Sequence, residues 1–294
     1  MSSSSSVDPG ASPTVVPSLA PGPVFDLGAF AAATPQGRAW AKRLQDRVQQ
    51  PPVRVRAPLW GGGVRIGSIE PETFARLSLA CLRPAGPQGM PGWTVEGPLT
   101  PALAQVAQAL RDEGQVRAWR DERLAVRGPD GQAVGAVERG VVRLLGTETE
   151  AVHLLGLAPD GRHWVQQRAL NKADDPGLWD TMVGGMVPAG ESVATALARE
   201  TGEEAGLSLA QLKQLQPGGW VRTERPHATT PGGYVVERLA WFRCTVPDGL
   251  APVNQDGEVA QFRLMDTGEL RERLLADEFT LDAALMLLAA GVQV

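Results

Sequence analysis

The apolar positions in the C-terminal half of the chain predict strands interspersed with helices. Short apolar runs bounded by turn residues, such as Pro159-Asp-Gly, are typical of strands, and apolar residues at helical spacing are typical of helices. The expected strands cover residues 151–157, 163–168, 178–183, 216–224, 233–245 and 259–264, with a Gly-rich turn after 183, and the expected helices cover 191–205, 266–276 and 280–290.

The N-terminal half has a different texture, with shorter elements and more turn residues. It predicts a small α+β unit, because helical and alternating patterns follow one another at short intervals. The expected elements are a helix at 37–49, a hairpin at 53–69 around three glycines, a short helix at 71–77, a loop at 83–98, a helix at 98–114 and a strand at 124–126 before a second Pro-Asp-Gly turn.

The first 23 residues contain seven Ser, five Pro and two Gly, and such a segment buries too little apolar surface to offset the entropy lost on ordering. We therefore expect three parts: a disordered tail over 1–35, an N-terminal α+β domain over 36–143, and a C-terminal domain over 144–294. A secretory signal is not expected, because no positively charged start or apolar core lies here.

Composition and charge argue against several classes of partner and site. The 294 residues carry a net charge of −5 with no basic stripe, which argues against binding to nucleic acid. No apolar stretch approaches the ~20 residues that a membrane span needs. Cys81 and Cys244 are far apart and outside any CxxC pair, so we expect buried thiols in the cytoplasm rather than a zinc ribbon or a disulfide framework.

Three glutamates near residue 200 are the strongest chemical signal. Glu200, Glu203 and Glu204 are spaced i, i+3 and i+4, so they share one face of the expected helix. An acidic run is often only a solvated face, but these carboxylates continue the apolar stripe of the helix. They should therefore point into the fold, where a divalent cation would offset their repulsion and lost solvation. Hard oxygen ligands favour Mg²⁺, or Mn²⁺, and Arg199 can pair with Glu203 or orient a glutamate.

The segment Gly185–Leu207 resembles the Nudix box, G-x5-E-x7-R-E-U-x-E-E-x-G-U, over all 23 positions, where U is aliphatic. The departure is Thr201 at the first U position, which affects local packing rather than a proposed ligand. The resemblance implies an α/β fold, a Nudix α/β/α sandwich with a mixed sheet, and hydrolysis of a nucleoside or other organic diphosphate. It also implies the roles of the site residues: Glu200, Glu203, Glu204 and the Gly185 carbonyl as metal ligands, Glu191 and Arg199 holding loop and helix in register, and Glu203 or Glu204 taking the proton of the attacking water.

This family often adds a carboxylate from a downstream loop, and Glu258 in Asn254-Gln-Asp-Gly-Glu is the candidate, as base or additional ligand. An ordinary polar turn is the alternative, because Asp-Gly is itself a turn signal.

Most of residues 37–291 also resemble the thiamine-pyrophosphokinase-related branch of Nudix proteins, which carry an α+β domain ahead of the hydrolase. The segments that carry this resemblance are GGGVRIGSIEPETFARL in the N-terminal half and WVQQRALNKADDPGLWDTMVGGMVPAGES, NQDGEVAQFRLM and FTLDAALMLLAAG in the C-terminal half. That branch implies hydrolysis of thiamine diphosphate, or its oxidised forms, to a monophosphate. A nucleoside diphosphate sugar or a dinucleotide is the alternative substrate, and a non-catalytic ligand sensor is the alternative function.

Four residues are candidates for contacting this small-molecule diphosphate. Arg168 and Lys172 could pair with a phosphate, while Trp179 and Trp220 could stack on a heteroaromatic ring or simply belong to the core. The N-terminal domain could form a homodimer or cover the active site.

Overall fold

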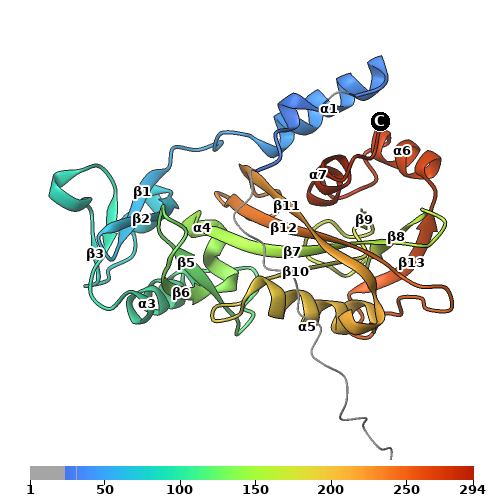
Figure 1. The fold of residues 1–294 in the computed structure, drawn as a ribbon. Helices are drawn as coiled ribbons and strands as arrows, with labels where there is room; N and C mark the ends of the chain where they lie inside the picture. Colours follow the sequence, from blue (N-terminus) through green and yellow to red (C-terminus); the bar gives the residue numbers. More distant parts are fainter. Residues whose placement is uncertain (1–23, 31) are drawn as a thin grey trace, which may run out of the picture.

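The computed structural model describes residues 24–30 and 32–294 (Figure 1), so residues 1–23 and 31 of the expected tail over 1–35 lie outside the described residues. The described residues that follow, although placed in the same tail by composition, pack against the fold. Val24 bridges to Trp220, and Leu27 is buried at the start of the 3₁₀ helix η1 (Leu27–Ala29), which Asp26 caps. Leu27 and Ala32 therefore belong to a core, against which Phe25 and Phe30 pack, that composition alone does not reveal.

A central seven-stranded mixed sheet forms the C-terminal half. Its main path runs β11-β12-β7-β8-β13, with β10 pairing to β7 and β9 to β8. The β12–β7 pair is parallel and the others are antiparallel, which confirms the mixed sheet. The strands are β7 (Glu148–Leu157), β8 (His163–Arg168), β9 (Trp179–Asp180), β10 (Val183–Met186), β11 (Lys213–Pro226), β12 (Tyr234–Thr245) and β13 (Val259–Met265).

Helices cover both faces of this sheet, as expected for an α/β/α sandwich (Figure 1). Successive side chains of a strand point to opposite faces, so Val152 and Leu154 of β7 pack with Ala196 and Leu197 of α5 (Val193–Ala205). Residues such as Ala151 face the other layer, which consists of α1 (Pro35–Val48), α6 (Thr267–Leu275) and α7 (Leu281–Ala289).

Helix α1 packs against the C-terminal half, although the sequence places it in the N-terminal unit. Trp40 and Leu44 are buried in the same core cluster as α7, and the Trp40 indole N–H donates to Asp277 Oδ1 at 3.1 Å. A Cβ on Gly37 would lie 2.1 Å from the carbonyl oxygen of Val294, so the helix approaches the C-terminus closely. The apolar stripe of α1 predicts that one face is buried but does not indicate which half of the chain covers that face. The expected boundary at 143/144 stays a prediction.

The remaining N-terminal residues form a small α+β unit with its own buried core. A four-stranded sheet has the order β2-β1-β4-β3, and a separate hairpin pairs β5 with β6. The expected loop at 83–98 contains β4, which is only three residues long and pairs in parallel with β1, so no alternation marks it. The elements are β1 (Ala57–Gly61), β2 (Val64–Ile69), α2 (Pro71–Ala75), β3 (Leu82–Arg83), η2 (Pro87–Gly89), β4 (Trp93–Val95), α3 (Leu99–Asp112), β5 (Arg123–Arg127), β6 (Ala133–Glu138), η3 (Arg139–Val141) and α4 (Val142–Leu145), with η4 (Leu209–Gln211) in the C-terminal half.

Cys81 and Cys244 are both free thiols, the first half-buried and the second buried, and burial raises the pKa of Cys244 to about 12. No helix among the residues that the structure describes is both long and apolar enough to cross a membrane.

Strand β5 joins the N-terminal unit to the loop that precedes α5. The backbone N–H of Ala189 donates to the Arg123 carbonyl at 2.8 Å, and Leu124, only 1% exposed, bridges to Pro188. Replacing Leu124 by Ala should lower the free energy of unfolding by about 2–5 kcal/mol, because it leaves a cavity at this junction. Urea unfolding measures the change.

The matched control is Val134→Ala on the partner strand, since Val134 is 37% exposed and its truncation should cost under about 0.5 kcal/mol. Equal losses in the free energy of unfolding for the two substitutions would show that burial of Leu124 at the junction does not stabilise the protein more than an exposed strand residue does.

Candidate functional site

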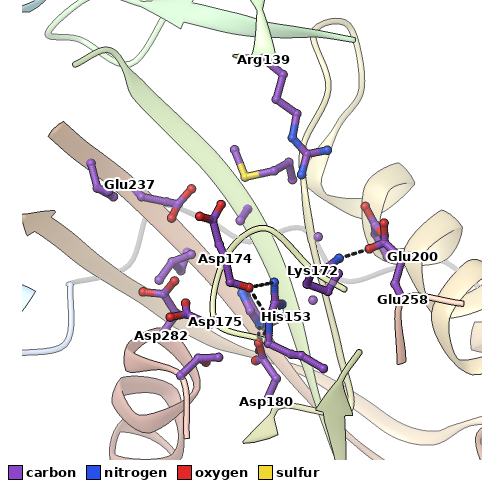
Figure 2. A pocket seen from close by; sticks show the side chains of 18 of the residues that line it. Arg139, His153, Lys172, Asp174, Asp175, Asp180, Glu200, Glu237, Glu258 and Asp282 are labelled. Atoms are coloured by element: carbon purple, nitrogen blue, oxygen red, sulfur yellow. Dashed lines mark hydrogen bonds and ion pairs between the residues drawn. The ribbon is translucent and has the colours of Figure 1, made fainter. Parts of the chain in front are cut away.

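A cavity of about 400 Å³ opens between the central sheet, α5 and the N-terminal unit (Figure 2). Its size is within the range of pockets that hold small molecules. Side chains of β7, β10 and β12 form part of its wall, and Glu122, Arg139 and Arg143 come from the N-terminal half. Both parts of the chain therefore build one cavity.

The three glutamates of α5 lie at different depths beside this cavity. Glu204 is buried at 3% exposure, the Glu200 side chain is 13% exposed, and the Glu203 side chain is 50% exposed. Glu200 and Glu203 line the cavity. The inward direction expected from the helical spacing therefore holds fully for Glu204 and Glu200, while Glu203 lies at the rim.

Arg199 ties the loop before α5 to the glutamates. Its Nη1 donates to Glu200 Oε1 and to Glu203 Oε2, both at 2.9 Å, and its Nε donates to Glu191 Oε2 at 3.3 Å. Nη2 reaches the carbonyl oxygen of Met186 at 3.3 Å. One guanidinium thus contacts the end of β10, the loop and the helix.

The two deeper glutamates lie where an ionised carboxylate is poorly solvated. Burial raises the pKa of Glu204 to about 8, although Glu204 Oε2 accepts hydrogen bonds from Gly184 N at 2.8 Å and from Gln166 Nε2 at 3.1 Å. Burial also raises the pKa of Glu200, against the opposing charge of Arg199. A bound cation would stabilise the ionised form of both groups.

Gly184 and Gly185 belong to strand β10 and not to the expected Gly-rich turn. They pair with His153 and Val152 of β7. A Cβ on Gly185 would lie 2.0 Å from Glu200 Cδ, so the glycine is required because the carboxylate packs directly on the backbone. The sequence predicts a turn at these glycines because no neighbouring residue indicates that Glu200 packs against them.

Thr201, which departs from the box pattern, is fully buried, and its hydroxyl donates to the Leu197 carbonyl at 2.6 Å. Its polar atom is satisfied within the helix, so the threonine replaces an aliphatic residue without leaving an unpaired group in the core.

The donor set fits a hard divalent cation in chemistry. Among the residues that the structure describes, however, no three His, Cys, Asp or Glu side chains are arranged to hold a metal ion. Glu200 and Glu203 are each bonded to Arg199 instead. The pKa values of Glu200 and Glu204 are raised, and Glu200 packs directly on Gly185. A bound cation would offset the negative charge of these buried carboxylates.

Residues 147–285 match the family model described as NUDIX domain. This part of the chain is a NUDIX domain. The match includes α5, the loop before it and all three glutamates.

Two plant relatives align with a longer part of this chain than the NUDIX domain. Nudix hydrolase 24, chloroplastic, of Arabidopsis thaliana is 29% identical over 196 residues, 63% of this chain and 51% of its own length. Nudix hydrolase 20, chloroplastic, of the same plant is 30% identical over 58% of this chain and 46% of its own length. A solved structure from Deinococcus radiodurans covers 56% of this chain and 97% of its own, with a TM-score of 0.46 and 22% identity.

The chain spans about half the length of these two curated relatives. The share of this chain aligned with the first is longer than the stretch from residue 147 to the C-terminus, so the alignment includes part of the N-terminal half.

Glu258, Lys172 and Arg168 of the NUDIX domain also line the cavity. Lys172 forms an ion pair with Glu258. Burial acts to raise the pKa of Glu258, but the hydrogen bond and charge of Lys172 outweigh it and lower the pKa. Arg168 pairs with Asp180 at 3.4 Å and donates to the Asp174 carbonyl, so both expected cations are at the site but already have protein partners.

Trp179 and Trp220 belong to the core and not to the cavity wall. They are 4% and 7% exposed, and arginines stack on both, Arg273 at 5.3 Å from Trp179 and Arg238 at 4.5 Å from Trp220. The structure therefore favours the packing alternative over ring stacking with a substrate. The sequence does not distinguish a strand Trp that packs in the core from one that faces a substrate.

Several cavity residues were not identified from the sequence. They are His153, Asp174, Asp175, Asp180, Glu237 and Asp282. Arg225 and His227 also line the cavity, and they belong to the stretch 222–227, for which the sequence leaves an exposed loop and a substrate lip as alternatives. Period-two alternation along β7 places His153 on the face of Ala151, which was the one usable signal. The others come from four separate elements or loops, and only the tertiary fold brings them together.

Proposed function

We propose that this chain is a divalent-metal-dependent pyrophosphohydrolase that cleaves the phosphoanhydride bond of an organic diphosphate. The observation that carries the proposal is the position of Glu200 and Glu203 on the wall of a cavity of about 400 Å³, with Glu204 buried behind them. The NUDIX domain and the names of the two plant relatives support the same activity.

Glu200, Glu203, Glu204 and the Gly185 carbonyl would hold Mg²⁺, or Mn²⁺. When bound, the cation polarises phosphoryl oxygens and makes water a better nucleophile. In the reaction, water adds to one phosphorus as the bridging P–O bond breaks, and its proton goes to a carboxylate. Glu203 and Glu258 are the candidates for this acceptor, because both line the cavity, whereas Glu204 is enclosed.

Other residues of the chain position these groups. Arg199 and Glu191 hold the loop against α5. Arg168 and Lys172 present positive charge to the same cavity, where they can pair with phosphate oxygens by exchanging their protein partners. Arg139 adds a further cation from the N-terminal half. We propose that this half serves to complete the cavity. A cytoplasmic location and a homodimer stay proposals.

For the substrate we propose thiamine diphosphate or its oxidised derivatives, from the resemblance to the thiamine-pyrophosphokinase-related branch. The test is a panel of thiamine diphosphate, its oxidised analogues, ADP-ribose and a dinucleotide, assayed with Mg²⁺ for released monophosphates. We expect metal-dependent release that is fastest for the thiamine compounds. Comparable rates on ADP-ribose or the dinucleotide would overturn the thiamine preference.

A binding measurement accompanies the panel. Because a cation would relieve the charge of Glu200 and Glu204, Mg²⁺ should raise the melting temperature and EDTA should reverse the rise. Ligand binding without any metal-dependent hydrolysis would favour the sensor function instead.

A further inference from the structure

The end of the cavity away from α5 holds a charged pair whose hydrogen-bonding capacity is largely unused. Arg225 of β11 and Asp282 of α7 both line the cavity, and Arg225 Nη2 lies 3.9 Å from Asp282 Oδ2, beyond hydrogen-bond distance. Arg225 Nε and Asp282 Oδ1 are buried and have no hydrogen-bond partner among the described residues. Buried polar groups are rarely left in this state, so each unpartnered atom requires an explanation.

The neighbouring charged groups do have partners. Arg143 donates to Glu237 Oε1 at 2.9 Å, and Thr149 donates to the same oxygen, also at 2.9 Å. Asp174 accepts from the Thr229 hydroxyl at 2.9 Å. Trp220 Nε1 and Thr223 Oγ1 of the same strand β11 are also buried without a partner among the described residues, but neither residue lines the cavity. Among the described residues that line the cavity, the unmet hydrogen-bonding capacity of buried atoms is therefore concentrated at Arg225 and Asp282, which points to a ligand at this place.

The charge of this wall indicates what kind of group fits. Apart from the ion pair of Arg168 with Asp180, carboxylates outnumber guanidinium groups at this end of the cavity. The carboxylates are Asp174, Asp175, Glu237 and Asp282 (Figure 2), and the guanidinium groups are those of Arg143 and Arg225. Burial raises the pKa of Asp282 to about 7, Arg225 opposes the rise, and Glu237 and Asp180 add to it. A phosphate would be repelled at this end, whereas a group that donates N–H bonds would be attracted.

We propose that Arg225 and Asp282 are the specificity-determining pair for the non-phosphate part of the substrate, and that they bind a nitrogen heterocycle with an exocyclic amino group. The Asp282 carboxylate accepts from the amino group, and the Arg225 N–H donates to the adjacent ring nitrogen. This complementary donor–acceptor edge occurs in an aminopyrimidine and in adenine. The inference rests on the proposed function, because the diphosphate is placed at the glutamate end.

The primary test is steady-state kinetics of Asp282→Asn with Mg²⁺. The substitution keeps the shape of the side chain but removes its charge and replaces one acceptor by a donor. For thiamine diphosphate and ADP we expect KM to rise about tenfold or more with kcat within about twofold. For isopentenyl diphosphate, which has no N–H group, KM should not change. Equal changes in KM for all three compounds, or no change for any of them, would overturn the proposal.

The matched control is Asp160→Asn, since Asp160 lies on an exposed turn outside the cavity and should leave all three KM values unchanged. Because Asp282 lies in the first turn of α7, Arg225→Gln is the second variant if Asp282→Asn does not fold. Arg225→Gln should likewise raise KM for thiamine diphosphate and ADP and leave KM for isopentenyl diphosphate unchanged.

Calorimetric titration of phosphate-free thiamine and adenosine into the wild-type chain without metal separates this inference from the proposed function. Binding that Asp282→Asn weakens about tenfold supports the pair even if no diphosphate is hydrolysed. The compound that binds distinguishes an aminopyrimidine from an adenine ligand. Failure of both to bind, or equal binding by the variant, would refute the pair even if hydrolysis is confirmed.

Discussion

Glu200→Gln is expected to lose about 100-fold or more of the hydrolytic rate while remaining folded. Glu200 lines the cavity, packs on Gly185 and is one of the carboxylates proposed to hold the cation. Gln has nearly the same shape but no charge, so the cation site is weakened without opening a void. Released monophosphate measures the rate, and the Mg²⁺-dependent rise in melting temperature should shrink in parallel.

The fold itself should tolerate this change. Burial disfavours the charge that the substitution removes, because it raises the pKa of Glu200, and Gln keeps an oxygen that can accept from Arg199. The control is Glu272→Gln on the exposed surface of α6, which should behave as the wild type in both measurements. Full turnover by Glu200→Gln would remove the metal assignment and the hydrolase mechanism built on it.

Gly185→Ala should lower the rate by about tenfold or more, although Gly185 contributes no side chain. Its Cβ would lie 2.0 Å from Glu200 Cδ and also 2.0 Å from Glu200 Oε1, so either the carboxylate or strand β10 must move. Overpacking of this kind costs about 1–3 kcal/mol of stability. Steady-state kinetics and thermal unfolding measure the two effects together.

Gly202 provides the matched glycine control on α5. A Cβ there meets nothing within 4 Å, and the residue lies in the interior of the helix at an exposed position. Gly202→Ala should therefore stabilise the protein by about 0.5–1 kcal/mol and leave the rate unchanged. If Gly185→Ala also retained the wild-type rate, the close contact with Glu200 would have no role in activity.

The mixed sheet and the helices of the C-terminal half could be predicted because their signals are local. Expected helices at 191–205, 266–276 and 280–290 correspond to α5, α6 and α7 within two residues at each end. The long strands β11 and β12 also correspond to expected strands, whereas the sequence predicts a loop at β4, because three residues carry no alternation. The sequence predicts a turn at Gly184 and Gly185, because glycine indicates only backbone freedom there. In the fold, these glycines allow the close approach of His153 and Glu200.

What the sequence by itself determined is the chemistry of α5 and its loop: the shared face of Glu200 and Glu204 and the pairing of Arg199 with Glu203 follow from helical spacing alone. What only the tertiary structure decided is everything that depends on residues far apart in the chain. It set the partner of α1, the burial of Trp179 and Trp220, and the meeting of Arg225 with Asp282. The physical reason is that backbone geometry fixes neighbours within a few residues, whereas the meeting of distant segments is decided by how the sheet and its two helical layers pack.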